Sequence, residues 1–405
     1  MGNLLVGQSG GPTAVINSSL AGVVSAGLRS GRKVYGAING INGVVGEHII
    51  SLDKFEDEKM LQLLKQTPSS YLGSCRKKLP AVDEEEAVYE KIFSVFQKYD
   101  IEYFLYIGGN DSMDTVDKLY RYAQKTGKNL KIAGVPKTID NDLAGTDHTP
   151  GYGSAAKFVA NAVRQLTLDA KVYDINSVTL VEIMGRNAGW LTGAACLARD
   201  KYFHGADIVC LPEVPFEMEE FLRQLERKNK TCKSLIVAIS EGIKDANGTY
   251  ICEYSDKKSN QDDQFAHAVL GGAGRTLEHY IKKNLGYKTR TVELNTLQRC
   301  FSQGAAKNDV EEAFLAGQKA VEWLENGDNG FMICFDRKDT AWYEIDYTTK
   351  PVADIANLEK KMPLSMIEKD GSGVTDEFFD YALPLIQGEP ELICKNGMIS
   401  FCTRA

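Results

Sequence analysis

Short apolar runs alternate with amphipathic segments along most of the chain. The runs predict buried strands at residues 3–6, 33–38, 103–107, 131–135, 177–183, 207–211 and 234–239. Apolar residues at helical spacing predict helices between them, among others at residues 84–99, 114–125 and 153–170. Strands that alternate with helices indicate βαβ units, so the pattern predicts an α/β fold with mostly parallel sheets.

The length predicts two domains, because 405 residues exceed what one hydrophobic core usually organises. We place a boundary near Pro150 and Gly151. The charged stretch at residues 256–263 predicts a surface loop.

Polar or glycine-rich turns follow four of the predicted strands. They are residues 7–11 (GQSGG), 108–112 (GGNDS), 136–142 (PKTIDND) and 240–242 (SEG). In open parallel sheets, ligands bind beyond the carboxyl ends of the strands. We therefore expect the functional groups to gather there.

The first turn is typical of a phosphate site. Gly10 and Gly11 let the backbone approach a ligand, and a helix beginning near Pro12 would offer unpaired N–H groups to a phosphate. A plain structural turn is the alternative. The turn also fits GxSxG, with Ser9 as a hydrolase nucleophile, although Ser9 follows the first strand and no HGGG segment occurs. The absence of GxGxxG and GxxxxGK[ST] argues against a nicotinamide enzyme and a Walker-type ATPase.

The PKTIDND stretch carries more polar chemistry than a turn requires. A carboxylate of Asp140 or Asp142 can take the proton of a substrate hydroxyl, and Lys137 can stabilise charge on a transferred group. The alternative is an Asx-rich turn. In GGNDS, the Asp111 carboxylate can hold Mg²⁺, although Asn110 or Asp111 can also simply cap a helix.

Other charged residues follow the later strands. Arg186 can bind a phosphate with its planar fork of donors, and Glu241 can accept hydrogen bonds from sugar hydroxyls. Arg290 and Arg299 can neutralise a second phosphate. Taken singly, each is also typical of an ordinary surface charge.

Composition narrows the class of partner. The net charge of −8 provides no basic field for nucleic acid or for an anionic membrane, so we expect small-molecule substrates, no nucleic acid and no membrane. The nine cysteines are scattered without a CxxC pair. No basic, apolar leader opens the sequence, and together these features predict a cytoplasmic protein.

Taken in order, the motifs resemble those of the phosphofructokinase family. The segments that carry the resemblance are the glycine turn at residues 10–11, LGSCR at 72–76, GGNDS at 108–112, PKTIDND at 136–142, MGR at 184–186, SEG at 240–242 and LQR at 297–299. The resemblance implies two Rossmann-like domains with the active site in the cleft between them. It implies residues 1–150 and about 307–365 in a donor domain, and residues 151–306 and about 366–405 in a fructose 6-phosphate domain.

The family's activity is phosphoryl transfer to the 1-hydroxyl of fructose 6-phosphate. By position, Asp140 would accept the proton with Asp142 and Thr138 in support, and Arg186 would stabilise the migrating group. The implied sugar-phosphate residues are Thr138, Ile139, Asp140, Met184, Gly185, Arg186, Glu241, Arg290, Thr296 and Arg299. The implied donor residues are Gly10, Gly11, Arg76, Gly109 and Lys137, with Mg²⁺ held near Asp111 and Asn110.

Two positions favour pyrophosphate as the donor. ATP-using members of the family generally have glycine where this chain has Asp111 and Lys137. A carboxylate at the first position would repel the α-phosphate of a nucleotide, and an ammonium at the second would pair with a terminal pyrophosphate oxygen. The resemblance thus implies reversible, pyrophosphate-dependent transfer in glycolysis by a homodimer or homotetramer. The alternatives are an ATP-dependent enzyme and a non-catalytic regulatory subunit that binds a sugar phosphate.

The chain departs from the family pattern at three places. Asn110 stands where ATP-using members have aspartate, which shifts the expected metal contact to Asp111. Ser177 occupies the position of an arginine that a neighbouring subunit often donates. Residues 300–302 replace the usual glycine pair after Arg299, and Lys307 is a candidate to compensate in the 6-phosphate pocket.

Overall fold

The structure, a computed structural model, describes residues 1–254 and 271–404. It consists of two compact units. The first comprises residues 1–155, 299–360 and 386–405, and the second comprises residues 156–298 and 361–385. The loop expected at residues 256–263 lies outside the described residues.

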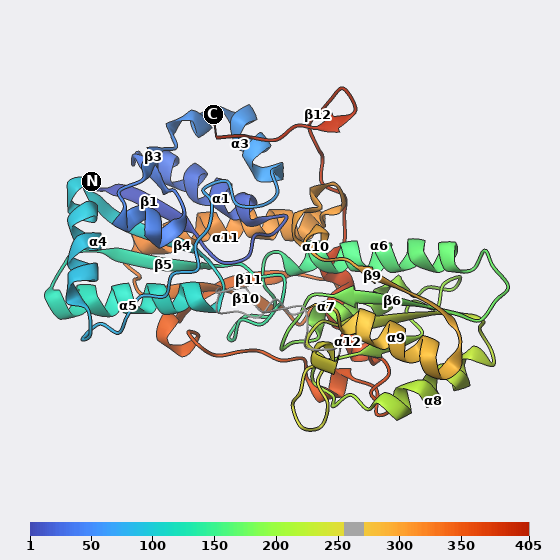
Figure 1. Cartoon of the computed structure of the whole chain (residues 1–405). Coiled ribbons are helices and arrows are strands. Elements are labelled where there is room, and N and C mark those ends of the chain that lie inside the picture. The colour runs from blue at the N-terminus through green and yellow to red at the C-terminus, as the bar shows by residue number, and fades with distance from the viewer. Residues whose placement is uncertain (255–270, 405) are drawn as a thin grey trace. The chain divides into compact units, whose positions relative to one another are not determined.

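The first unit is built on a seven-stranded sheet (Figure 1). The strand order is β11-β10-β5-β4-β1-β2-β3. The bounds are β1 (Asn3–Gln8), β2 (Val34–Ala37), β3 (Ile49–Ser51), β4 (Ile101–Gly108), β5 (Lys131–Pro136), β10 (Phe331–Arg337) and β11 (Ile345–Pro351). The inner strands are parallel, and the two edge strands β3 and β11 run antiparallel to their neighbours.

Side chains that alternate along these strands form one core on each face of the sheet. On β4, Tyr103 and Leu105 pack in the core that includes α1 and α11, whereas Phe104 and Tyr106 pack in the core that includes α4 and α5. The helices are α1 (Ile16–Arg29), α2 (Gly40–Val45), α3 (Glu58–Gln66), α4 (Glu86–Lys98), α5 (Asn110–Thr126) and α11 (Lys307–Asn326). The first unit is therefore a three-layer α/β sandwich, as the strand–helix alternation predicted.

The second unit contains a four-stranded parallel sheet in the order β7-β8-β6-β9. Its strands are β6 (Ser177–Ile183), β7 (Ile208–Cys210), β8 (Ser234–Ser240) and β9 (Lys288–Glu293). Its helices are α7 (Trp190–Gly193), α8 (Met218–Asn229), α9 (Ala273–Leu285) and α12 (Asp376–Ala382). Two further helices, α6 (Tyr152–Ala170) and α10 (Leu297–Cys300), contain the points where the chain passes between units. Phe221 of α8 and Leu277 of α9 pack with Val178 and Val237 in one core.

All seven predicted strands are present, and the predicted α/β class with mostly parallel sheets is confirmed. One helix boundary was wrong. The first helix begins at Ile16 and not near Pro12, since Pro12 and Thr13 have no regular structure and Ala14 and Val15 form a bend. No helix in the described ranges is long and apolar enough to cross a membrane.

The C-terminal segment does not follow the expected domain division. We expected residues 366–405 in the second domain, but residues 386–405 belong to the first unit. The side-chain amide of Gln66 donates to the carbonyls of Ile393 (3.0 Å) and Ser400 (2.6 Å), and its oxygen accepts from the Ile393 N–H (2.9 Å). The hairpin of β12 (Cys394–Lys395) and β13 (Met398–Ile399) lies within this segment.

Candidate active site

Three of the predicted turns lie at one edge of the first unit's sheet. Strand β4 is hydrogen-bonded to β1 on one side and to β5 on the other, with Gln8 beside Ile107 and Gly108 beside Pro136. The carboxyl ends of these strands lead directly into GQSGG, GGNDS and PKTIDND. The chain continues from β1 to β2 on one side and returns to β4 on the other, which makes this edge a topological switch point, the usual ligand site of such sheets.

The backbone of the glycine turn lies close to two cationic side chains. A Cβ atom added to Gly10 would lie 3.2 Å from the Lys137 ammonium, and one added to Gly11 would lie 3.1 Å from a terminal nitrogen of Arg299. Gly10 also has φ = +76°, a conformation that glycine adopts most easily. The Ser74 hydroxyl donates to the Gly10 carbonyl (2.6 Å), so the LGSCR segment fixes the turn.

Lys137 is the most deeply buried charged group of the three turns. Its side chain is only 2% exposed, and the ammonium donates to the Gly11 carbonyl at 2.7 Å. Burial lowers the pKa of Lys137 to about 8, against the raising influence of Asp140 and Asp142. Lys137 is therefore still largely charged at neutral pH, and an anion bound at the glycine turn would stabilise the charged form further.

Two carboxyl groups follow Lys137 at close range. The backbone N–H of Asp140 donates to the Thr138 hydroxyl oxygen (3.1 Å), and Asn141 takes a left-handed conformation with φ = +56°. Burial, together with the negative charge of Asp140, raises the pKa of Asp142 to about 7. A pair of carboxyl groups that holds a proton near neutral pH is suited to acid–base chemistry.

Asn110 and Asp111 form the first turn of α5, but neither side chain caps the helix. The N-cap is Gly109, without a side-chain cap bond, so the capping alternative is wrong. Asp111 is 63% exposed and pairs with Lys78 at 2.8 Å. The side-chain oxygen of Asn110 is buried and has no hydrogen-bond partner in the part of the chain that the structure describes.

These oxygens fit a hard cation only with further ligands. Within residues 1–254 and 271–404, no group of three or more His, Cys, Asp or Glu side chains is placed to hold a metal ion. Mg²⁺ commonly takes one or two protein oxygens and completes its shell with substrate phosphates and water. Asn110 and Asp111 therefore fit an ion that is held largely by a phosphate ligand.

The second unit brings its two predicted turns together. The Ser240 hydroxyl donates to the Gly185 carbonyl (2.6 Å), and the Glu241 N–H donates to the Ile183 carbonyl (2.9 Å). A Cβ atom on Gly242 would lie 1.8 Å from the Arg186 carbonyl oxygen, so only glycine allows this approach. The MGR and SEG turns thus form one site at the neighbouring ends of β6 and β8.

The remaining predicted residues lie at different distances from these turns. The Met184 N–H donates to the Gln298 side chain (3.2 Å), which places the segment after β9, with the exposed Thr296, beside the MGR turn. Arg290 on β9 instead pairs with Asp169 (2.5 Å) and donates to Thr179 (3.1 Å). Sequence reasoning missed Gln298, whose only signal was its place within LQR.

The phosphofructokinase family model matches residues 3–324. The chain is 41% identical over 96% of its length to the pyrophosphate–fructose 6-phosphate 1-phosphotransferase of Xanthomonas campestris, and the match covers 93% of that protein. This chain belongs to the phosphofructokinase family. The corresponding enzyme of Halomonas elongata is 38% identical over 98% of this chain and 94% of its own length. The crystal structure of pyrophosphate-dependent phosphofructokinase from Nitrosospira multiformis superposes with a TM-score of 0.89 at 34% identity, over 99% of this chain and 95% of that one.

Membership in the phosphofructokinase family decides against the hydrolase alternative. The structure agrees, because the Ser9 hydroxyl is buried and donates to the Cys75 carbonyl at 3.2 Å. A serine nucleophile needs a base as its hydrogen-bond partner, and a carbonyl cannot serve as one. The reading of Ser9 as a nucleophile is wrong.

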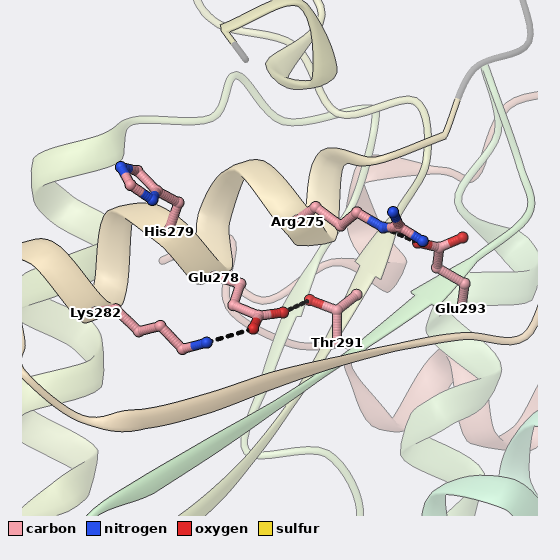
Figure 2. Close-up of a pocket in the computed structure, with 6 residues that line it drawn as sticks. All are labelled: Arg275, Glu278, His279, Lys282, Thr291 and Glu293. Carbon is pink, nitrogen blue, oxygen red and sulfur yellow. Dashed lines mark hydrogen bonds and ion pairs between the residues drawn. The ribbon is translucent and has the colours of Figure 1, made fainter. Parts of the chain in front are cut away.

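A pocket of about 520 Å³ lies elsewhere in this phosphofructokinase, between α9 and β9 (Figure 2). Its charged side chains neutralise one another, since Arg275 binds Glu293 (2.7 Å) and Lys282 binds Glu278 (2.6 Å). Thr291 donates to the second oxygen of Glu278 at 2.7 Å. None of the predicted site residues lines this pocket, so the candidate active site remains at the strand ends.

Proposed function

We propose that this phosphofructokinase transfers a phosphoryl group reversibly from pyrophosphate to the 1-hydroxyl of fructose 6-phosphate, as a step of glycolysis. The single observation that carries the donor assignment is the buried ammonium of Lys137, held 2.7 Å from the Gly11 carbonyl at the glycine turn. The two full-length relatives described above are named for this reaction. Their names support the same donor and acceptor for this chain.

The donor phosphates bind at the glycine turn of the first unit. Gly10 and Gly11 provide close backbone approach, and Gly109 leaves the start of α5 open, since the nearest atom to an added Cβ lies at 3.6 Å. Lys137 binds the phosphoryl group that moves, and the exposed guanidinium of Arg76 binds outer oxygens of the donor. Because Asp111 points to Lys78, donor choice depends chiefly on Lys137.

The chemistry is an in-line displacement at the terminal phosphorus. The sugar O1 forms a new P–O bond, the bond from that phosphorus to the bridging oxygen breaks, and phosphate leaves with the bond's electron pair. Asp140 takes the proton of the 1-hydroxyl, with Thr138 and Asp142 holding its local structure. Lys137 and Arg186 stabilise charge on the migrating group.

The sugar phosphate binds mainly to the second unit. Met184, Gly185 and Arg186 with Glu241 hold the sugar, and Ile139 is assigned to the same substrate. We assign the 6-phosphate to Arg290, Thr296 and Arg299. Binding at Arg290 requires it to exchange its partner Asp169 for the phosphate, whereas the Nε atom of Arg299 is buried without a partner among the described residues.

Mg²⁺ is the cofactor we propose, with Asn110 and Asp111 as its protein contacts. When bound, the ion would supply positive charge that offsets the negative charge of the pyrophosphate. We also infer a cytoplasmic enzyme that forms a homodimer or homotetramer. The nine cysteines, which all lie in the described part of the chain, are free thiols, as is usual in a reducing compartment.

The test is an assay of the purified protein with Mg²⁺, fructose 6-phosphate and either pyrophosphate or ATP, in both directions. We expect turnover with pyrophosphate and with fructose 1,6-bisphosphate plus phosphate. Turnover with ATP alone would reverse the donor assignment. Binding of fructose 6-phosphate without turnover from either donor would identify a regulatory subunit.

A further inference from the structure

A buried ionic cluster lies in the first unit, beyond the PKTIDND stretch. At its centre is His148, whose side chain is 1% exposed. One ring nitrogen lies 2.8 Å from the Asp147 carboxylate, and the other lies 2.8 Å from the Glu312 carboxylate on α11. The proposed mechanism uses none of these groups.

The carboxylates that flank His148 are themselves held in place. The Tyr343 hydroxyl donates to the second oxygen of Glu312 (2.6 Å), and Arg337 donates to Asp147 (2.9 Å). The Lys360 ammonium also holds this segment, since it donates to the backbone carbonyl of Asp147 (2.7 Å). The His148 ring also contacts Phe335 of β10, with a centroid separation of 4.9 Å.

The residue after His148 connects this cluster to the catalytic stretch. The Thr149 hydroxyl donates to the Thr138 carbonyl (2.9 Å), and the Thr149 N–H donates to the Asn141 side chain (3.1 Å). Thr138 and Asn141 flank Asp140. A shift of His148 would therefore move the backbone on both sides of the proposed proton acceptor.

A second contact to α11 acts on the same segment. The Asp309 carboxylate accepts the N–H groups of Gly151 and Ser154, both at 2.8 Å. Residues 147–154 are thus attached to α11 through Glu312 and through Asp309. The attachment through His148 depends on a group that loses a proton as the pH rises through about 9.

We propose that His148 is a positioning residue for phosphoryl transfer: as an imidazolium between Asp147 and Glu312, it fixes residues 146–151 against α11 and, through Thr149, sets the position of Asp140. This inference rests on the proposed function, in which Asp140 accepts the proton. A displacement of about 1 Å in a reacting group can reduce the rate by about a hundredfold.

The charge of the imidazole is essential to this role. A charged imidazole donates from both nitrogens, whereas a neutral one donates from only one and leaves the other carboxylate facing a lone pair. Burial alone would lower the pKa of His148, but Glu312 and Asp147 outweigh it and raise it to about 9. The contact is therefore intact at neutral pH and is lost as the pH rises through that value.

The test compares His148→Gln with His279→Gln, the same change at an exposed histidine of α9. We expect kcat of His148→Gln with pyrophosphate to fall about tenfold while both KM values change less than about threefold. In both proteins kcat should decline above about pH 8, as Lys137 and Lys360 lose their charge, and only the further decline of the wild type above about pH 9 should be absent from the variant. Amide hydrogen exchange of residues 138–151 should become faster, and His279→Gln should match the wild type in every measurement.

Unchanged kcat and unchanged exchange in a folded His148→Gln protein would overturn the inference. If that variant does not fold, Tyr343→Phe decides, because it removes only the hydroxyl that holds Glu312. It should accelerate exchange of the same residues and lower kcat, and wild-type behaviour in both would equally refute the role of His148. Failure of this inference can be told apart from failure of the proposed function. If the wild-type protein is inactive with pyrophosphate, amide exchange in the variants still shows whether His148 holds residues 138–151 in place.

Discussion

In the proposed function, donor choice depends chiefly on one buried side chain, that of Lys137. Replacement of Lys137 by Met keeps the apolar stem but removes the ammonium beside Gly11. We expect kcat with pyrophosphate to fall about 10²- to 10³-fold, as when a preorganised donor to a developing charge is lost. Steady-state kinetics check this against Lys59→Met, an exposed lysine of α3 that should leave the rate unchanged. A Lys137→Met enzyme with normal pyrophosphate turnover would contradict the donor assignment.

The pH dependence of the reaction follows from the two carboxyl groups. Asp142 binds a proton as the pH falls through about 7, because it is buried and repelled by Asp140. The forward rate should therefore decline on the acid side of neutrality. The substitution Asp142→Asn removes a negative charge beside Asp140, so Asp140 should bind a proton only at lower pH. The acid limb of the kcat/KM profile should therefore move down by about one pH unit. The kcat/KM profile is measured from pH 5 to 9. An acid limb at the same pH in the variant and the wild type would show that the charge of Asp142 does not affect Asp140.

Much of this site could be predicted from the sequence, for a physical reason. Its residues belong to short contiguous turns, and parallel strands place such turns at one edge, so Lys137, Asp140 and Gly11 could be grouped before any contact was known. Contacts between residues far apart in the chain could not be predicted in this way. The pairing of Asp111 with Lys78 and the placing of Arg299 beside Gly11 depend on packing that no local pattern encodes.

Among the elements, the crossing of α1 and α11 is the closest. A Cβ atom on Gly22 would lie 1.9 Å from the Phe314 carbonyl oxygen, and one on Gly317 would lie 2.1 Å from that of Ser19. The helices lie side by side in Figure 1 (blue and orange). Glycine at both positions lets the backbones meet.

An added methyl group at this crossing should force the two helices apart. We expect Gly22→Ala or Gly317→Ala to destabilise the protein by about 1–3 kcal/mol, despite the better helix propensity of alanine. Urea denaturation measures the effect. The control is Gly271→Ala, where the nearest atom to the new Cβ lies at 3.7 Å and no change is expected. Equal midpoints for all three variants would show that the crossing can relax without cost.

Buried strands were predictable, even at an edge as for β7, whereas strands with exposed residues were not. The seven predicted strands are short apolar runs, whereas β9 (KTRTVE) and β11 (IDYTTKP) have mostly half-exposed or exposed residues at sheet edges. The hydrophobic signal is weak there because one edge and part of a face meet water. Strand β10 (FMICFDR) is buried and apolar, so the signal for it was present in the sequence.

At the scale of the whole molecule, the C-terminal segment completes the first unit. Cys402 is buried in its core, and its N–H donates to the Thr67 hydroxyl oxygen (2.8 Å). Removal of residues 392–405 leaves the hydrogen-bonding groups of Gln66 without these partners and uncovers apolar side chains. We expect the melting temperature to fall by roughly 5 °C or more. Deletion of residues 403–405 alone is the control, and an equal melting temperature for both truncations would show that the segment contributes nothing.

The division of the chain has a consequence for synthesis. The first unit takes its residues from three separate stretches, residues 1–155, 299–360 and 386–405. A ribosome that has made residues 1–155 has therefore released only part of a sheet, since β10 and β11 come almost two hundred residues later. Neither unit can be cut out as one continuous fragment. The nascent protein must keep an unfinished apolar face until β10 and β11 have been made, which exposes it to aggregation and makes it a natural client for chaperones.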